Sequence, residues 1–137
     1  MNKKFRIVLI EDDADDVELL QESLATHKVD YAMTVIKDGS AAIQFCDTAE
    51  FLPDIIIMDF NLPKVHGRDV IDKIRCNEKF SQVPILILST SSSKEDINYA
   101  YEVGADQYLV KPATIEAIKQ TVDTIVQLAG RKTVSAN

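Results

Sequence analysis

Apolar residues occur along this chain in short, nearly unbroken runs, and each run is followed by polar residues. Three runs, at residues 5–10, 54–58 and 83–88, are rich in Ile, Val and Leu. Two weaker runs lie at residues 31–36 and 107–110. Continuous apolar runs of this length are typical of strands that are buried on both faces of a parallel sheet. The sequence therefore predicts five strands.

The segments between these runs show the three- and four-residue spacing of amphipathic helices. The most regular segment has its apolar positions at Ile115, Ile118, Val122, Ile125, Val126 and Ala129. Similar faces are formed by Val17, Leu20 and Leu24, and by Ile97, Ala100, Tyr101 and Gly104. Strands that alternate with helices imply right-handed crossovers and a parallel sheet with helices on both faces. We expect an α/β domain of five strands and five helices.

Local signals indicate where some helices begin and end. Ser92 and Glu95 resemble a capping box before a helix. Gly104 and Gly130 stand where helices are expected to stop. We therefore expect one domain over residues 1–130 and a short tail over residues 131–137, with no output domain.

Composition and charge narrow the functional classes. The 137 residues are 46% hydrophobic and 27% charged, which is ordinary for one globular domain. The net charge of -7 argues against a nucleic-acid surface, because such surfaces depend on Lys and Arg. The first apolar run is too short for a signal peptide or a membrane span. The two cysteines form no CxxC pair. We expect a cytoplasmic protein that binds neither nucleic acid nor membrane.

Polar residues that can carry chemistry stand at the ends of the predicted strands. These residues are Glu11 and Asp12 after the first run, Asp59 after the third, Ser89 after the fourth and Lys111 after the fifth. In a parallel sheet the carboxyl ends of the strands lie along one edge, where ligands of open α/β sheets bind. We therefore expect these five side chains to converge on one small site.

The predicted site suits a divalent cation. Carboxylates gathered in one pocket repel one another unless a cation balances them. Mg²⁺ prefers oxygen ligands and uses few carboxylates, with water and phosphate oxygens completing its shell. We expect Mg²⁺, with Mn²⁺ as an alternative, to be held by Glu11, Asp12, Asp59 and the backbone carbonyl of Asn61.

Asp59 is the best candidate for a nucleophile. A carboxylate can attack phosphorus and form an aspartyl phosphate. In phosphoryl transfer the protein mainly positions the groups and neutralises charge. Lys111 supplies a positive charge for one phosphoryl oxygen, and the Ser89 hydroxyl can donate a hydrogen bond to another.

In order and spacing, these motifs resemble bacterial response-regulator receiver domains. The matching stretches are RIVLIEDDADDVELL, PDIIIMDFNLPKVHG, VPILILSTSSSKEDI and EVGADQYLVKP, which together span about residues 5–129. They are most similar to the stand-alone receivers that serve phytochrome-type and other sensor histidine kinases. The resemblance implies a flavodoxin-like, doubly wound sheet with strand order 2-1-3-4-5.

The resemblance also implies a role for each matching residue. Asp59 corresponds to the phosphoacceptor and Lys111 to the phosphoryl-binding lysine. Glu11 and Asp12 correspond to the acidic pair at the metal ion, with Asp12 the more direct ligand. Asn61 corresponds to the residue whose backbone carbonyl completes the metal shell.

Two further residues match the family's switch pair. Ser89 would move toward the phosphoryl group, and Tyr108 would follow into the vacated space. Pro112 corresponds to a proline whose peptide bond is usually cis. Ser89 and Thr90 stand where the family more often has Thr and Ala, but no catalytic group is lost.

The function that the resemblance implies is a signalling switch rather than an enzyme. A sensor histidine kinase or a histidine phosphotransfer protein would supply the phosphoryl group. The surface formed by the helix around Ile97, the strand 107–110 and the helix from Ile115 would then engage an unknown downstream protein or form a homodimer. Action as a phosphate sink for a competing kinase reaction is equally compatible with the sequence.

Three other functions share some of these features. A haloacid-dehalogenase-like phosphatase also uses an aspartate, Mg²⁺ and a lysine, but its motif would fall on residues 13–15, beyond the strand end. A flavodoxin-like electron carrier needs a Ser/Thr/Gly-rich phosphate loop where this chain is acidic. An interaction module that works without phosphorylation usually lacks part of the site, which is complete here.

The remaining polar and aromatic residues are expected to have simpler roles. Asp13, Asp15 and Asp16 are interpreted as a solvated helix start that the helix dipole favours. His66 is interpreted as a surface loop residue, and Tyr99 as a surface aromatic. Cys46 and Cys76 are expected to be structural thiols.

Overall fold

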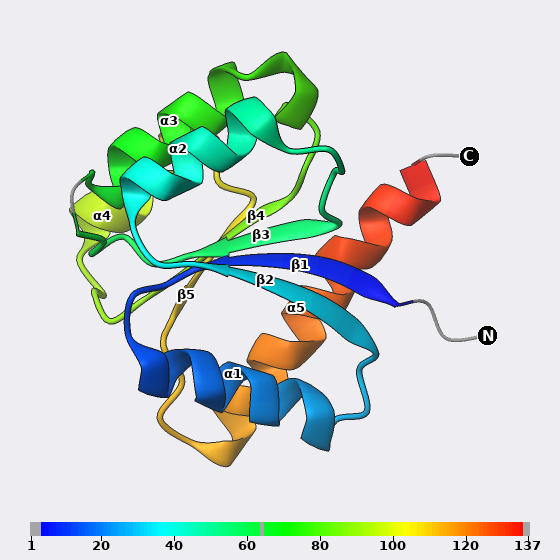
Figure 1. The fold of residues 1–137 in the computed structure, drawn as a ribbon. Coiled ribbons are helices and arrows are strands. Elements are labelled where there is room, and N and C mark those ends of the chain that lie inside the picture. The colour runs from blue at the N-terminus through cyan, green and yellow to red at the C-terminus, as the bar shows by residue number, and fades with distance from the viewer. Residues whose placement is uncertain (1–3, 64, 136–137) are drawn as a thin grey trace.

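A parallel sheet runs through the centre of the molecule, in a computed structural model that describes residues 4–63 and 65–135 (Figure 1). Its strands are β1 (Phe5–Ile10), β2 (Tyr31–Ile36), β3 (Ile55–Met58), β4 (Ile85–Ser89) and β5 (Gln107–Val110). The strand order is β2-β1-β3-β4-β5, and every neighbouring pair is parallel. The predicted fold class and strand order are confirmed.

The pattern of apolar residues in a strand depends on how many of its faces are buried. Every residue of β3 and β4 is buried, and these strands came from the most continuous apolar runs. In β2, at the edge of the sheet, exposed residues alternate with partly buried ones. This difference arises because central strands are covered on both faces, whereas an edge strand meets solvent along one side.

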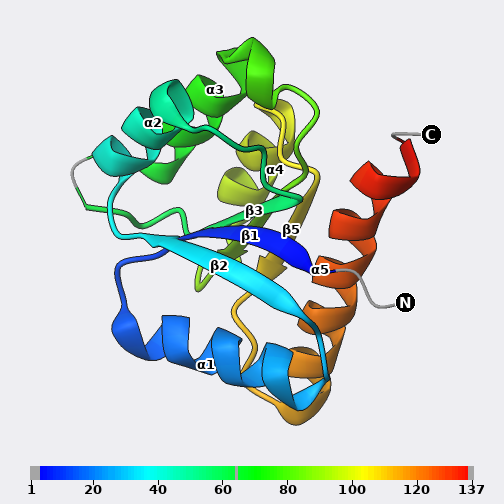
Figure 2. The ribbon, with the colours of Figure 1, turned by 45° about the vertical axis from the view of Figure 1, so that its right-hand side comes forward.

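Two helical layers cover the sheet. The helices are α1 (Ala14–Thr26), α2 (Gly39–Thr48), α3 (Gly67–Cys76), α4 (Lys94–Glu102), α5 (Ile115–Ser135) and the short 3-10 helix η1 (Glu78–Phe80). Helices α2, α3 and α4 lie on one face, and α1 and α5 lie on the other (Figures 1 and 2). Within the part of the chain that the structure describes, no helix has the length and apolarity needed to cross a membrane.

Two helix boundaries differ from the predictions. The N-cap of α4 is Ser93, whose side chain accepts from the Asp96 N–H, so the cap lies one residue after Ser92. Helix α5 continues through Gly130 to Ser135. Glycine weakens a helix interior by only about 1 kcal/mol relative to alanine, so it need not end one. Gly104, with φ 116°, does follow the end of α4 as predicted. The last two residues of the predicted tail lie outside the described residues.

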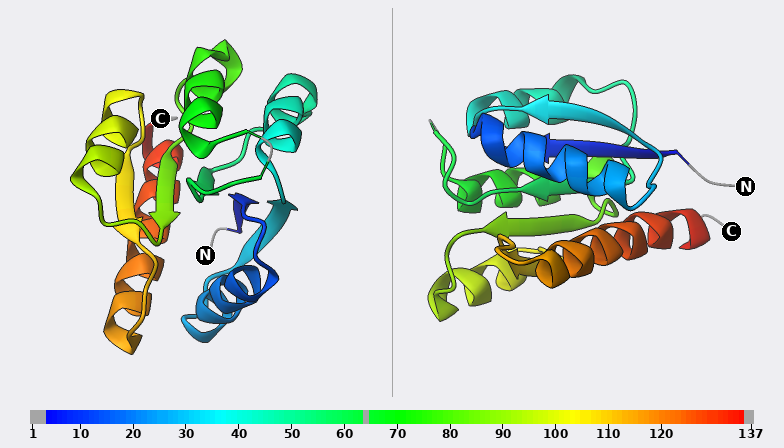
Figure 3. Two further views of the ribbon diagram at one scale, coloured as in Figure 1. Left: turned by 90° about the vertical axis from the view of Figure 1, so that its left-hand side faces the viewer. Right: turned by 90° about the horizontal axis from the view of Figure 1, so that it is seen from below.

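All five strands point the same way (Figure 3). Their carboxyl ends, and the loops that follow them, therefore gather at one end of the sheet. The loops after β1, β3, β4 and β5 carry the residues that the sequence singled out for chemistry.

Candidate functional site

The carboxyl edge of the sheet brings the predicted polar residues together. Glu11, directly after β1, is 4% exposed, and Asp59, directly after β3, is 7% exposed. Ser89 is the last residue of β4 and is fully buried. The Lys111 N–H donates to the Ser89 carbonyl at 2.8 Å, which places the end of β5 beside the end of β4. The expected convergence is therefore present in the fold.

Three carboxylates at this edge form a cluster that fits a metal ion. Glu11, Asp12 and Asp59 each offer one oxygen, and these oxygens lie within 4.8 Å of one another. Glu11 and Asp59 are buried, whereas Asp12 is exposed. An all-oxygen, carboxylate-rich donor set suits Mg²⁺ or Mn²⁺.

Electrostatics at the cluster favour a bound cation. Burial raises the pKa of the Glu11 carboxyl above its usual value, because a charged carboxylate loses solvation there. Lys111 partly offsets this effect, and the charge of Asp59 adds to it. A divalent cation would remove the repulsion between the carboxylates.

The Asp59 side chain is held by groups on both sides. Its Oδ1 accepts from the Asn61 N–H at 3.1 Å, and its Oδ2 accepts from the Lys111 ammonium at 3.0 Å. Asn61 itself is exposed. Its backbone carbonyl as a metal ligand stays a prediction, since no contact in the structure tests it.

Lys111 is the centre of the charge network. Its Nζ lies 2.6 Å from Asp16 Oδ2, 2.9 Å from Glu11 Oε1 and 3.0 Å from Asp59 Oδ2. Burial by itself would lower the pKa of Lys111, but the hydrogen bonds to these three carboxylates outweigh it and raise the pKa above its usual value. The side chain is therefore a charged ammonium beside Asp59.

The sequence patterns did not predict the contact between Lys111 and Asp16. The expected solvated helix start describes Asp13, which is exposed and caps α1 by accepting from the Asp15 and Asp16 N–H groups. Asp16, however, turns toward Lys111. This contact could have been predicted from the position of Asp16, which lies in the first turn of a helix that begins at the carboxyl edge of the sheet.

The predicted switch residues are joined through Ser91. The Ser91 N–H donates to Ser89 Oγ at 3.2 Å, and the Tyr108 hydroxyl donates to the Ser91 carbonyl at 2.8 Å. Tyr108 is only 7% exposed, and its ring packs edge-on against Phe60 with centroids 5.7 Å apart. The Ser91 hydroxyl also donates to Asp96 Oδ2 at 2.7 Å, which connects the network to α4.

Three smaller expectations need correction or refinement. No described peptide bond is cis, so the expected cis bond at Pro112 is wrong, and the bond has the ordinarily favoured trans form. Tyr99 is only partly exposed, because the Arg68 guanidinium lies 3.9 Å from its ring centroid. His66 is an exposed loop residue, as expected, but its Nδ1 also caps α3 by accepting from the Arg68 N–H.

A small cavity lies behind the site, between α1 and α5. Its volume is about 50 Å³, and its walls are mostly apolar, including Leu20, Ile57 and Val122. Asp16 and Lys111 are among the polar residues that line it. The charge network therefore borders mostly apolar side chains of α1 and α5 on this side.

Most of the chain is similar to a known protein family and to individual proteins. A family described as the response regulator receiver domain matches residues 7–123. The response regulator Rcp1 of Synechocystis sp. is 33% identical over 124 residues, which cover 87% of this chain and 84% of that protein. The probable methanogenesis regulatory protein FilR2 of Methanothrix harundinacea is 31% identical over 125 residues, covering 88% and 81%.

Solved structures of similar sequence share the fold. The phosphorylated cyanobacterial phytochrome response regulator RcpA superimposes with a TM-score of 0.81 at 31% identity, covering 91% of this chain and 93% of that one. The Mn²⁺-bound form of the response regulator Rcp1 gives 0.78 at 32% identity, covering 89% and 91%. One similar protein has thus been observed phosphorylated, and another with Mn²⁺ bound.

Proposed function

This chain belongs to the response regulator receiver family, and from that premise we propose that it is a phosphorylation switch whose phosphoacceptor is Asp59. The observation that carries the proposal is the pairing of Asp59 Oδ2 with the Lys111 ammonium at 3.0 Å, beside the acidic cluster. A nucleophilic carboxylate, a positive charge for the phosphoryl oxygens and a metal-binding donor set are then within one small site.

The proposed reaction uses the buried carboxylate directly. An Asp59 oxygen forms a bond to phosphorus while the P–N bond of a phosphohistidine breaks, and the leaving imidazole keeps that electron pair. Lys111 neutralises charge on a phosphoryl oxygen, and the Asn61 N–H keeps the second Asp59 oxygen oriented. Glu11, Asp12, Asp59 and the Asn61 carbonyl would hold the metal ion, which supplies further charge neutralisation when bound.

The signal would leave the site through the loop after β4. Ser89 Oγ accepts from the Ser91 N–H, and the Ser89 O–H would donate to a phosphoryl oxygen on Asp59, so a turn of the hydroxyl toward that oxygen would pull on its contact with Ser91. Displacement of Ser91 would alter its contacts with Tyr108 and with Asp96 of α4. Because Tyr108 is already buried, we place the movement in this loop rather than in an inward swing of the ring. A loop with two arrangements is the kind of element that phosphorylation biases.

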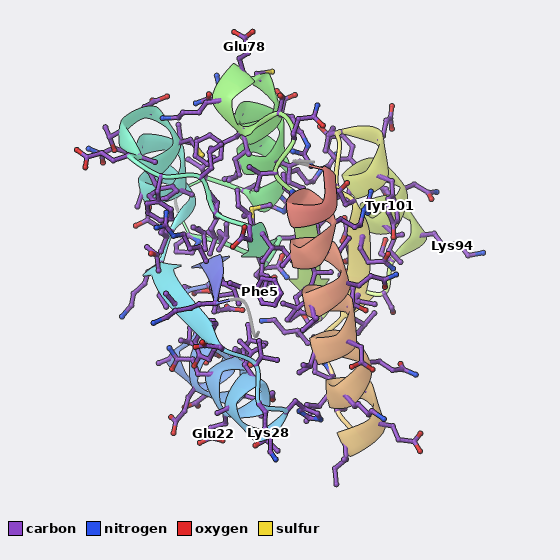
Figure 4. All side chains as sticks on the ribbon, turned by 90° about the vertical axis from the view of Figure 1, so that its right-hand side faces the viewer. Phe5, Glu22, Lys28, Glu78, Lys94 and Tyr101 are labelled. Atoms are coloured by element: carbon purple, nitrogen blue, oxygen red, sulfur yellow. The ribbon has the colours of Figure 1, made fainter. Side chains whose placement is uncertain are left out.

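The proposed switch needs a partner that donates the phosphoryl group and a partner that receives the signal. A sensor histidine kinase or a histidine phosphotransfer protein would donate the phosphoryl group. The surface of α4, β5 and α5 carries exposed apolar side chains, with Tyr101 44%, Val110 46% and Ile115 85% exposed. Figure 4 shows Tyr101 and Lys94 on α4, on the side of the molecule where α5 runs. We propose this surface for a downstream protein or a second copy of the chain.

The decisive measurement is intact mass after incubation with acetyl phosphate and Mg²⁺. We expect one added phosphoryl group in wild type, dependent on Mg²⁺ and absent in Asp59→Asn. Asp15→Asn is the matched control, because it removes an exposed carboxylate near the site. If wild type gains no phosphoryl group and binds no beryllofluoride, an interaction module that works without phosphorylation becomes the better explanation.

A further inference from the structure

The ion pair between Lys111 and Asp16 lies outside the residues that the family resemblance accounts for. We propose that Asp16 is a positioning residue, which holds the Lys111 ammonium beside Asp59 so that it meets the incoming phosphoryl oxygen. The inference rests on the proposed phosphoryl transfer to Asp59 and names a further residue on which its rate depends.

The hydrogen-bonding capacity of Lys111 is fully used. An ammonium has three N–H donors, and the described structure places three carboxylates around Nζ. The contact with Asp16 is the shortest of these, at 2.6 Å, and hydrogen bonds between two charged groups are the strong ones. Asp16 is therefore a principal determinant of where the ammonium sits.

The three carboxylates differ in what else they do. Glu11 and Asp59 belong to the cluster that fits a metal ion, and Asp59 is also the proposed phosphoacceptor. Asp16 is not part of that cluster. Its carboxylate thus stays available to Lys111 when the other two serve the metal ion and the phosphoryl group, and the donors they release become free for phosphoryl oxygens.

The position of Asp16 is well defined by the fold. It lies 95 residues from Lys111 in the sequence, in the first turn of α1, where the Asp13 side chain accepts from its backbone N–H. Leu20 and Leu24 anchor α1 in the core.

If Asp16 acted only through its negative charge, its removal would speed phosphorylation, whereas loss of a positioning residue would slow it. A negative group near Asp59 repels an anionic phosphodonor, so removing it should speed the reaction if repulsion were its only influence. Asp15 provides the comparison: it is an exposed carboxylate in the same helical turn and lies outside the described contacts of Lys111. Asp15→Asn therefore measures repulsion without loss of the ion pair.

The test is the rate of phosphorylation by acetyl phosphate at saturating Mg²⁺. We expect Asp16→Asn to be about tenfold slower, the order expected for loss of one charge-assisted hydrogen bond at a partly exposed group. Asp15→Asn should match wild type or be slightly faster, and Asp16→Glu should recover part of the loss. In a Lys111→Met background, Asp16→Asn should have no further effect, because it acts through the lysine.

A second measurement needs neither metal nor donor. The NMR signal of the Lys111 ammonium should be protected from exchange in wild type and Asp15→Asn, and should lose protection in Asp16→Asn. The proposal is overturned if Asp16→Asn reacts as fast as Asp15→Asn, if its defect persists without Lys111, or if the ammonium signal is unchanged. Wild type that takes up no phosphoryl group would instead overturn the proposed function, and this inference with it.

Discussion

The two cysteine side chains lie in opposite environments. Cys46, on α2, is 5% exposed and belongs to the core beneath α2 and α3, whereas Cys76, at the end of α3, is exposed. Burial raises the pKa of the Cys46 thiol to about 11, and the charge of Asp47 adds to this effect. Because the thiolate is the reactive form of cysteine, the two residues should differ sharply in reactivity.

We expect a thiol reagent at about pH 8 to modify one cysteine in the folded protein and both in denaturant. Cys76→Ser should abolish the reaction of the folded protein, while Cys46→Ala should leave it intact. Colorimetric titration of free thiols provides the count. Rapid modification of both thiols without denaturant would contradict the burial of Cys46.

The Cys46 thiol also predicts a pH dependence of stability. Its pKa rises from 9.0 to about 11 on folding, so between these values the unfolded chain loses this proton more readily. The free energy of unfolding should therefore fall as pH rises through this window, by up to about 1.4 kcal/mol per pKa unit. Urea unfolding of wild type and Cys46→Ala should show a gap that narrows with rising pH. A constant gap would contradict the prediction.

At the scale of elements, Arg75 joins three segments on the α3 side of the sheet. Its guanidinium donates to the carbonyls of Gly104 at 2.8 Å and Val83 at 2.8 Å. It also pairs with Asp106 at 2.7 Å, and that same carboxylate oxygen accepts from the Ile85 N–H. The end of α3 is thereby tied to the start of β4 and to the turn before β5.

Arg75→Met should lower the free energy of unfolding by about 2–4 kcal/mol, because it leaves carbonyls and a carboxylate without their donor. Arg68→Met on the same helix is the matched control. Arg68 stacks on the Tyr99 ring, and loss of that contact should cost at most about 1 kcal/mol. Denaturant unfolding measures both, and equal losses would contradict the role assigned to Arg75.

Two glycines predict opposite effects of the same substitution. A Cβ on Gly130, within α5, would meet nothing within 4 Å, so Gly130→Ala should stabilise the protein by about 0.5–1 kcal/mol through helix propensity. A Cβ on Gly67 would lie 2.6 Å from the Phe60 Cα and 2.8 Å from the Asp59 carbonyl oxygen. Gly67→Ala should therefore lower the thermal midpoint, and a neutral result would contradict the close approach of α3 to the site.

At the scale of the whole molecule, the acidic cluster links metal binding to stability. An ion that binds only the folded state stabilises it by about 2.7 kcal/mol at a hundred times its dissociation constant. We expect Mg²⁺ to raise the thermal midpoint of wild type and of Asp15→Asn, and a chelator to reverse the rise. Asp12→Asn should weaken the response. An undiminished response in this variant would place the ion elsewhere.

The strands and their parallel direction were predictable because their causes are local, whereas the strand order was expected only from the family resemblance. Central strands need continuous apolar residues, and alternation with helices requires parallel crossovers, so the runs at 5–10 and 54–58 led directly to β1 and β3 inside the sheet. Parallel topology also places all strand ends at one edge. That rule was sufficient to predict that Glu11, Asp59 and Lys111 lie close together.

Contacts between distant side chains depended on the tertiary structure. The Asp16–Lys111 pair, the Arg75 network and the link from Tyr108 to Ser91 require particular distances between packed elements. Sequence spacing does not encode those distances, because they depend on how each helix sits on the sheet. The sequence by itself determined the elements and the edge where the chemistry lies. Only packing decided which carboxylates reach Lys111.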